Sequence, residues 1–156
     1  MAALIPDDLA ELFEGGVSIL VGTRDAGLVA EATRGVGAVV HPDRRRLTVF
    51  LPVSVSDRAI ANLGDNGSLA VGFSSMLDHR TLQVKGKVEA IRDATEAERE
   101  IVSRYHAAFG EVLFIVGIPR VISRALNVWP CHAVTFEATD IFLQTPGPNA
   151  GERISA

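Results

Sequence analysis

The sequence predicts a mainly β fold with α-helical insertions, in which six or seven antiparallel strands form a barrel. Three observations favour this fold class. Residues 34–87 consist of alternating strand-like segments that one short helix interrupts. Residues 80–91 alternate strictly between apolar and polar side chains, as in a strand with one buried face. Regular alternation of strands with helices is missing, which argues against a doubly wound fold.

Length and composition narrow the class of protein further. A chain of 156 residues fits one domain, residues 1–156. The net charge of −4 argues against a sequence-independent nucleic-acid binder. The single cysteine, Cys131, excludes an intrachain disulfide and fits a reducing cytoplasm. The first residues lack the pattern of a secretion signal, and no apolar run reaches the ~20 residues that span a bilayer. We therefore expect a cytoplasmic protein that binds neither nucleic acid nor membrane.

The first elements are a helix and a hairpin. Residues 5–13 are expected to form a short helix, because Pro6 and two aspartates occupy its first turn. Two strands follow at 17–22 and 28–33, joined by a turn at 24–27 whose glycine suits a hairpin.

The central elements lie on both sides of one helix. Strands at 35–41 and 47–51 flank a polar turn. A short helix then starts at Ser54, and the glycine-bounded segment 64–67 closes it. The strand at 68–73 and the alternating strand described above come next.

The last third is predicted to hold two helices and a strand. Thr95 and Glu98 have the spacing of a capping box, so a helix should start there. Gly110 is its expected stop, and 112–125 should form another helix that the internal Gly-Ile-Pro can break. A final strand at 133–143 precedes an irregular tail rich in proline and glycine.

The helix start at Ser54 is the best candidate binding site. A helix N-terminus presents free amide groups and partial positive charge, which together favour an anion. Ser54 and Ser56 carry hydroxyl groups, and Arg58 can form charge-assisted hydrogen bonds with a phosphate. The alternative is that one serine caps the helix and Arg58 is solvated, and the motif by itself favours this alternative.

Other polar positions are weaker candidates. Arg34 precedes Gly35 and Gly37, which let a ligand or another backbone come close; the alternative is a barrel corner with an exposed arginine. Thr81 starts the alternating strand, where it can equally be a hairpin-end residue. The four histidines have no ligand-like spacing, so no metal site is expected, and Cys131 shows no sign of being a nucleophile.

Taken together, these segments resemble the pyridoxamine 5′-phosphate oxidase-like FMN-binding split-barrel family. The segments that carry the resemblance are the strand at 34–37, the helix start at 56–59 after the strand 47–51, and the strand 80–89 ending in Gly-Lys-Val-Glu. The resemblance implies a split barrel that forms a homodimer, with FMN in the cleft between the subunits. The apolar segment 112–118 fits such an association.

The resemblance also implies roles for particular residues. Arg34 matches an arginine that contacts the FMN phosphate, and Ser56 and Arg58 match the phosphate-binding helix start. Residues 36–39 match strand backbone beside the flavin ring, and Thr81 matches a polar side chain that reaches the cofactor. The expected cofactor-binding residues are Arg34, Gly35, Val36, Gly37, Ala38, Val39, Leu51, Pro52, Ser54, Ser56, Arg58 and Thr81.

Three departures from the family pattern limit the expected activity. Asp57 stands where the oxidase has a second basic residue, and Leu51 and Pro52 replace a more polar pair. The Arg-x-His element that holds the vitamer phosphate has no counterpart in 133–156. The sequence thus predicts an FMN-dependent oxidoreductase acting on a small molecule other than pyridoxamine phosphate, with no identified catalytic residue.

Three alternatives keep the same fold. The deazaflavin F420 would need a channel for its anionic tail, which Arg44, Arg45 and Arg46 would supply unless they form a solvated turn. Haem would need an axial ligand, and any of the histidines can serve. A flavin-binding dimer without turnover is the third alternative.

Overall fold

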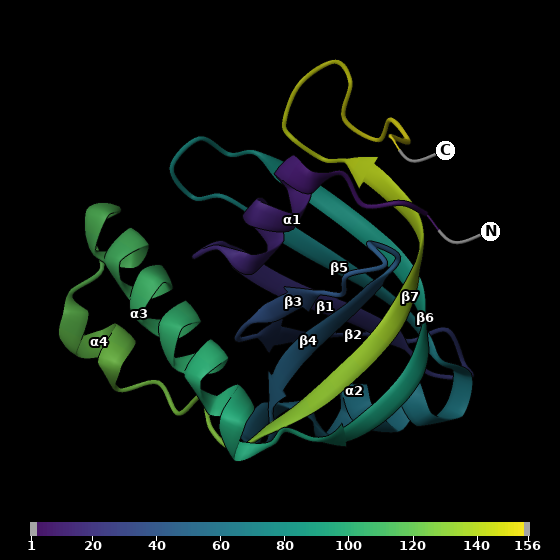
Figure 1. Cartoon of the computed structure of the whole chain (residues 1–156), viewed down its shortest axis with the longest axis horizontal. Coiled ribbons are helices and arrows are strands. Elements are labelled where there is room, and N and C mark those ends of the chain that lie inside the picture. Colours follow the sequence, from purple (N-terminus) through teal and green to yellow (C-terminus); the bar gives the residue numbers. More distant parts are fainter. Residues whose placement is uncertain (1–2, 155–156) are drawn as a thin grey trace.

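The computed structural model describes residues 3–154, in which seven antiparallel strands form one strongly curved sheet (Figure 1). The order across the sheet is β2-β1-β5-β6-β7-β4-β3. The strands are β1 (Ser18–Arg24), β2 (Ala30–Gly35), β3 (Ala38–Val40), β4 (Arg46–Pro52), β5 (Ser68–Ser74), β6 (Thr81–Asp93) and β7 (Cys131–Leu143). The predicted mainly β class with antiparallel strands is confirmed.

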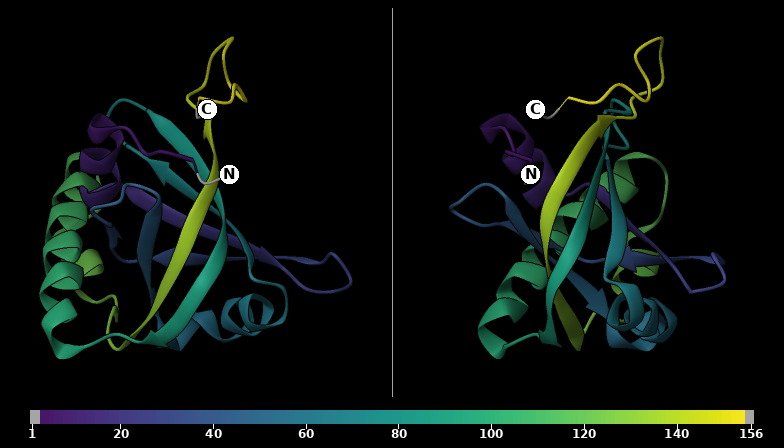
Figure 2. Two further views of the ribbon diagram at one scale, coloured as in Figure 1. Left: turned by 45° about the vertical axis from the view of Figure 1, so that its right-hand side comes forward. Right: turned by 90° about the vertical axis from the view of Figure 1, so that its right-hand side faces the viewer.

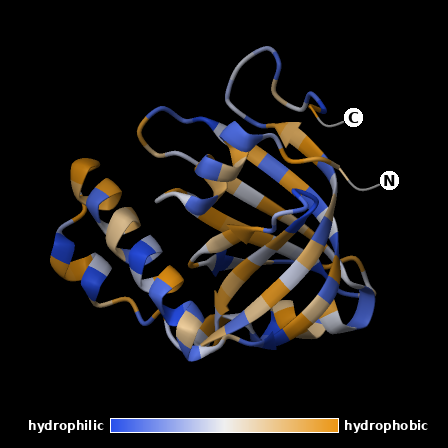
Figure 3. Cartoon of the chain, viewed as in Figure 1, coloured by the Kyte–Doolittle hydropathy of each residue, from blue (hydrophilic) through white to orange (hydrophobic). Residues whose placement is uncertain are grey.

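Hydrophobic and hydrophilic residues alternate along several strands (Figure 3), and alternate side chains of β5 are buried inside the curved sheet. Val71 and Phe73 of β5 and Val84 of β6 are almost completely buried, as the period of two requires. Phe13 comes from the N-terminal helix and stacks on Phe73, with ring centroids 4.2 Å apart. The helix thus covers one end of the core.

The chain between β2 and β3 crosses onto β4 and joins the two sides of the sheet. The Val36 amide donates to the Phe50 carbonyl at 2.8 Å, and the Phe50 amide donates to the Gly37 carbonyl at 3.0 Å. A Cβ on Gly35 would lie 2.5 Å from Cγ2 of Ile19, and Gly37 has a φ of 147° that other residues rarely adopt. The two glycines therefore allow the close packing and the backbone conformation that this corner of the barrel requires.

Two strand boundaries differ from the sequence prediction because of this corner and a turn. Gly35 ends β2, so the strand expected at 35–41 begins only at Ala38. The second strand begins at Ala30 instead of Leu28, because Leu28 takes a left-handed φ of 64° within the turn.

The helices lie at the ends and on one side of the sheet (Figures 1 and 2). They are α1 (Asp7–Glu14), α2 (Val53–Asn66), the 3₁₀ turn η1 (Glu96–Glu98), α3 (Arg99–Ile115) and α4 (Arg120–Arg124). Among residues 3–154, no helix combines the length and the apolar character needed to cross a membrane.

The stop predicted at Gly110 is wrong, because α3 continues to Ile115. Gly110 faces α4 instead: a Cβ there would lie 3.3 Å from Oγ of Ser123. The glycine therefore marks a close approach between two helices, while the predicted break near Pro119 is confirmed.

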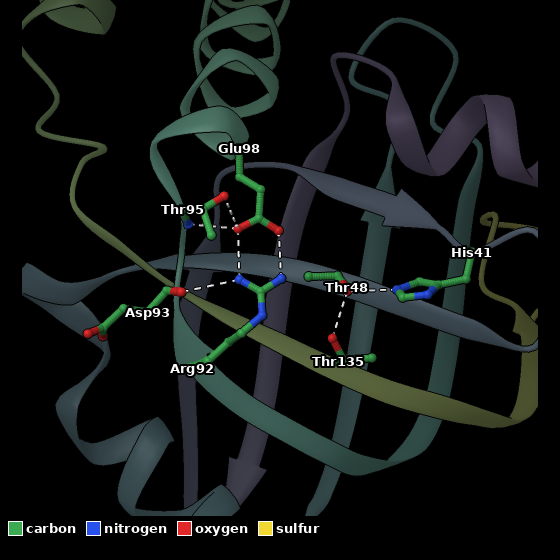
Figure 4. Close-up of polar contacts among 7 residues, drawn as sticks. All are labelled: His41, Thr48, Arg92, Asp93, Thr95, Glu98 and Thr135. Carbon is green, nitrogen blue, oxygen red and sulfur yellow. Dashed lines mark hydrogen bonds and ion pairs between the residues drawn. The ribbon is translucent and has the colours of Figure 1, made fainter.

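The predicted capping box is confirmed and is joined to β6 by an ion pair (Figure 4). The Thr95 amide donates to Oε2 of Glu98 at 2.8 Å, and Arg92 donates to both carboxylate oxygens at 2.8 and 2.7 Å. The hydrogen bonds from Arg92 and Thr95 lower the pKa of Glu98 to about 2.

Candidate functional site

A mostly apolar hollow of about 310 Å³ lies where the ends of β2 and β4 meet the start of α2 and the α4–β7 linker. Its volume is at the lower end of the range for small-molecule sites, ~300–1,000 Å³. Val55 and Leu126 in its wall are 61% and 50% exposed, so apolar surface here faces solvent. The lining residues are Ala32, Thr33, Arg34, Val36, Pro52, Val55, Leu126, Asn127 and Val128.

Local chemistry explains why these segments converge. Pro52 ends β4 with a φ of −58° and directly precedes α2, whose first residue Val53 donates its amide to the Pro130 carbonyl at 2.9 Å. The buried hydroxyl of Thr33 donates to the Val55 carbonyl at 3.0 Å. The first turn of α2 is therefore fixed against both β2 and the linker.

Arg34 is the cation of this hollow. Its guanidinium donates to Oγ of Ser18 at 3.2 Å and forms no ion pair with any carboxylate of residues 3–154. Because nearby α2 begins with amides that lack intrahelical acceptors, this edge of the hollow carries unbalanced positive charge.

The predicted residues of the helix start are arranged differently. The buried hydroxyl of Ser56 donates to the Pro52 carbonyl at 2.8 Å, while Ser54 is exposed. Arg58 approaches Glu31 at 3.4 Å and Asp25 at 4.0 Å, so it lies beside carboxylates of the β1–β2 hairpin. Ser56 and Arg58 thus have partners within the chain, and neither they nor Ser54 line the hollow.

Thr81 lies away from Arg34, across the sheet. Its hydroxyl donates to Oγ of Ser74 at 3.0 Å, and Ser74 is the register partner of Ser18. With neighbouring strands ~4.8 Å apart, the three strand steps from β2 to β6 separate Thr81 from Arg34 by roughly 14 Å. Thr81 instead borders another hollow, of about 290 Å³, beside the C-terminal segment.

The remaining predicted positions divide between the core and a different surface. Gly35, Gly37 and Ala38 are buried in the barrel corner, and Leu51 is in the core. Val39 borders a hollow between α1, β3 and α3. Of the predicted set, the structure brings Arg34, Val36 and Pro52 together in the apolar hollow.

The basic turn before β4 forms no channel to this hollow. Arg44 donates to the Ile5 carbonyl at 2.7 Å and pairs with Asp7 at 3.0 Å, and Arg46 pairs with Asp43. The turn also lies at the opposite end of β4 from Pro52, roughly 20 Å away at ~3.3 Å per residue.

His41 and Cys131 have structural surroundings. His41 bonds to Thr48, which bonds to Thr135 (Figure 4), with atoms 2.9 and 2.8 Å apart. None of the residues lining the hollow is a histidine, and no metal-binding group of three or more suitable side chains occurs between residues 3 and 154. Burial raises the pKa of Cys131 to about 12, which keeps the thiol protonated and unreactive.

Sequence reasoning missed the segment 126–128 and Val55. Leu126 and Val55 are apolar residues on exposed surface, and no local pattern distinguishes such positions from ordinary surface residues. The one indication in the sequence is that Val55 lies in the first turn of α2, the helix whose start was the predicted binding site.

Comparisons with known proteins show the fold. No protein-family model matches the chain, and no curated protein sequence matches it. An F420 reductase structure shares 14% identity, with 88% of this chain and 98% of that chain covered and a TM-score of 0.59. A candidate pyridoxamine 5′-phosphate oxidase from Lactobacillus delbrueckii shares 12% identity, with coverages of 91% and 99% and a TM-score of 0.56. An FMN-binding protein from Syntrophomonas wolfei shares 14% identity, with coverages of 84% for both chains and a TM-score of 0.52.

These likenesses confirm the architecture expected from the sequence, the split barrel of pyridoxamine 5′-phosphate oxidase-like proteins. At such low identity the shared property is the arrangement of strands and helices.

Proposed function

From the shared split-barrel fold, we propose that this protein binds FMN in the hollow beside Arg34 and acts as an oxidoreductase on a small molecule. The observation that carries the proposal is an arginine without a carboxylate partner at the edge of a mostly apolar hollow. Such a combination suits a ligand with a flat apolar ring and one anionic group. A protein of the same fold that binds FMN supports the choice of ligand.

In this proposal the chain's own residues hold and shield the cofactor. Arg34 binds the phosphate, and the first-turn amides of α2 add to the positive field there. The Thr33–Val55 hydrogen bond keeps the wall in place, and Val36 and Pro52 exclude water from the ring. FMN, when bound, supplies the redox chemistry. Because no lining side chain is an acid or base, proton exchange in this protein falls to the substrate or solvent.

A second copy of the chain completes the site. The apolar walls of the hollow are partly exposed, whereas small-molecule sites bury most of their ligand. Further exposed apolar side chains lie on the α3–α4 region, and Leu20 of β1 is 44% exposed. The large exposed side chains in and directly after these helices are Phe114, Ile115, Val116, Val121 and Ile122, with Leu126 in the linker that follows α4. We therefore propose a homodimer with the cofactor between its subunits.

The first test is flavin retention. Purified protein is mixed with FMN, passed through gel filtration and examined by visible absorption. Arg34→Ala should weaken binding about tenfold or more, as expected for a lost charge-assisted hydrogen bond. Arg45→Ala is the matched control, because Arg45 is exposed on the distant basic turn. Equal flavin retention by both variants would contradict the proposed phosphate contact.

Sedimentation tests the subunit arrangement separately. A mass of two chains is expected for the flavin-bound protein. If flavin stays bound to a particle with the mass of one chain, the site is not shared between two subunits. The Arg34 contact would still be tested by the Arg34→Ala and Arg45→Ala variants.

F420 is the second candidate, since an F420 reductase has the same fold. The unpaired Arg34 suits its phosphate equally well, but the basic turn expected to hold its tail is distant and paired with carboxylates. Competition decides between the two: FMN should displace F420, and preferential retention of F420 would reverse the assignment.

A further inference from the structure

A second hollow, of about 330 Å³, lies between α3 and α4 and has a different chemical character. It is lined largely by charged and polar side chains and belongs to none of the contacts proposed for FMN. The lining residues are Ser103, His106, Ala107, Gly110, Glu111, Arg120, Ser123, Arg124 and Val128.

The sequence builds this hollow from one face of α3 and one face of α4. Ser103, His106 and Gly110 follow each other at spacings of three and four, which places them on the same side of the helix. Ser123 packs against Gly110, and the ring Nε2 of His106 lies 2.8 Å from the Ser123 carbonyl oxygen. A carbonyl only accepts, so Nε2 carries the hydrogen and the ring is fixed in position.

One of the two arginines is already neutralised. Arg120 donates from Nε and Nη2 to the two carboxylate oxygens of Glu111, at 2.9 and 2.5 Å, and lies 3.6 Å from the centroid of the Phe114 ring. This pairing raises the pKa of Arg120 and lowers that of Glu111, so both stay charged and their charges cancel.

The other arginine forms no such hydrogen-bonded pair, although its charge also helps to lower the pKa of Glu111. Arg124 lies one helical turn after Arg120 and borders the same hollow. Among residues 3–154 its side chain takes part in no hydrogen bond or ion pair, and Glu111 is the one acidic residue in the lining. One positive charge is therefore left over in a recess that also contains two serines and a histidine.

We propose that the α3–α4 hollow is a binding site for a small organic anion that carries a carboxylate or phosphate group. The guanidinium of Arg124 binds the anionic group, because its planar donors match two oxygens of either kind. Ser103 and His106 provide further polar contacts, and Ala107 and Val128 contact the apolar part of the ligand.

The site adjoins the proposed cofactor hollow. Val128 belongs to the lining of both recesses, and Leu126 and Asn127 of the same linker line the cofactor side. An anion bound between α3 and α4 therefore contacts the segment that forms one wall of the other site, although its binding does not depend on flavin.

The test uses flavin-free full-length protein, with inorganic phosphate and acetate as separate probes. Binding is followed through the NMR resonances of the His106 ring, because Arg34 can also attract phosphate. Saturable shifts are expected in the millimolar range, and Arg124→Gln should weaken the affinity about tenfold or more. The matched control is Arg104→Gln, because Arg104 is an exposed arginine of α3 that borders a different hollow.

A second variant should have the opposite effect. Glu111→Gln removes the carboxylate that neutralises Arg120, so phosphate should bind more tightly than to the wild type. Arg34→Ala should leave the His106 response unchanged, which separates this site from the proposed FMN site. Shifts that do not saturate, equal affinity in Arg124→Gln and wild type, or weaker binding by Glu111→Gln would each overturn the proposal. The stronger of the two probes identifies the preferred anionic group.

Discussion

Val128 lines both hollows, but the two differ in whether their arginines are paired with carboxylates. Beside Arg34 the walls are apolar and the arginine has no carboxylate partner, whereas between α3 and α4 one arginine is paired and another is not. Arg58 and Arg44 show the other extreme, since both lie beside acidic side chains. An arginine therefore becomes available to a ligand where no carboxylate is hydrogen-bonded or ion-paired to it, as the contrast between Arg124 and Arg120 beside the same Glu111 shows.

The largest effect should come from the barrel corner next to the apolar hollow. In Gly35→Ala the new Cβ would meet Cγ2 of the fully buried Ile19, which should cost about 2 kcal/mol of unfolding free energy. Urea denaturation measures this loss, and flavin retention should fall with it while the His106 response to phosphate persists.

The control for that substitution is Gly64→Ala, in which no heavy atom lies within 4 Å of the new Cβ. Because alanine is favoured over glycine inside a helix, this variant should gain about 0.5–1 kcal/mol. Equal stability changes in the two variants would mean that the corner does not constrain Gly35.

The wall of the apolar hollow is tested by Thr33→Val. Loss of the hydrogen bond to the Val55 carbonyl should cost about 1 kcal/mol and weaken flavin binding. Thr135→Val removes a similar hydroxyl contact, to Thr48, far from the hollow. Calorimetry and flavin titration should show a comparable loss of stability in both variants but weaker binding in Thr33→Val alone.

Acid should weaken the link between β6 and α3. The folded-state pKa of Glu98 is lowered to about 2, so its stabilising contribution is complete above about pH 4.5 and is lost as the pH falls through 2. After allowance for partial exposure this contribution is about 1 kcal/mol at neutral pH.

Glu98→Gln should therefore be less stable than wild type at neutral pH, and the two should converge in acid. Glu96→Gln breaks only an exposed pair with Arg99 and should match wild type throughout. Urea titrations across this pH range measure both variants, and a Glu98→Gln deficit that persists unchanged in acid would refute the assignment.

The smallest effect is expected for Arg58→Ala. Its ion pairs are exposed, so the loss of stability should be below about 0.5 kcal/mol, and flavin retention should match wild type. If Arg58→Ala retained flavin as poorly as Arg34→Ala, the helix start would be the phosphate site after all. The distinction between paired and unpaired arginines would then be wrong.

The elements that could be predicted from the sequence are those that depend on a local residue pattern. Alternation placed β6, and the spacing of Thr95 and Glu98 placed the start of the last helical region. Gly110 shows the limit: a glycine that ends a helix and one that lets another helix approach look the same without tertiary contacts.

The candidate site was predictable only in part for the same reason. Arg34, Val36 and Pro52 could be identified, but the pairing of Arg58 with the hairpin carboxylates depends on how the hairpin packs beside α2. The apolar wall at 126–128 comes from a linker with no distinctive sequence, and only the fold brings it to the strand ends.

The hydrogen bonds between Val36 and Phe50 and between Phe50 and Gly37 fasten the seam of the barrel directly beside Arg34. A molecule bound there would contact the chain on both sides of these hydrogen bonds. Breaking them to open the barrel would then require the molecule to dissociate first. Occupancy should consequently appear as slower exchange of the Val36 and Phe50 amide hydrogens with solvent. The exchange of these two amide hydrogens thus reports whether a ligand occupies the site.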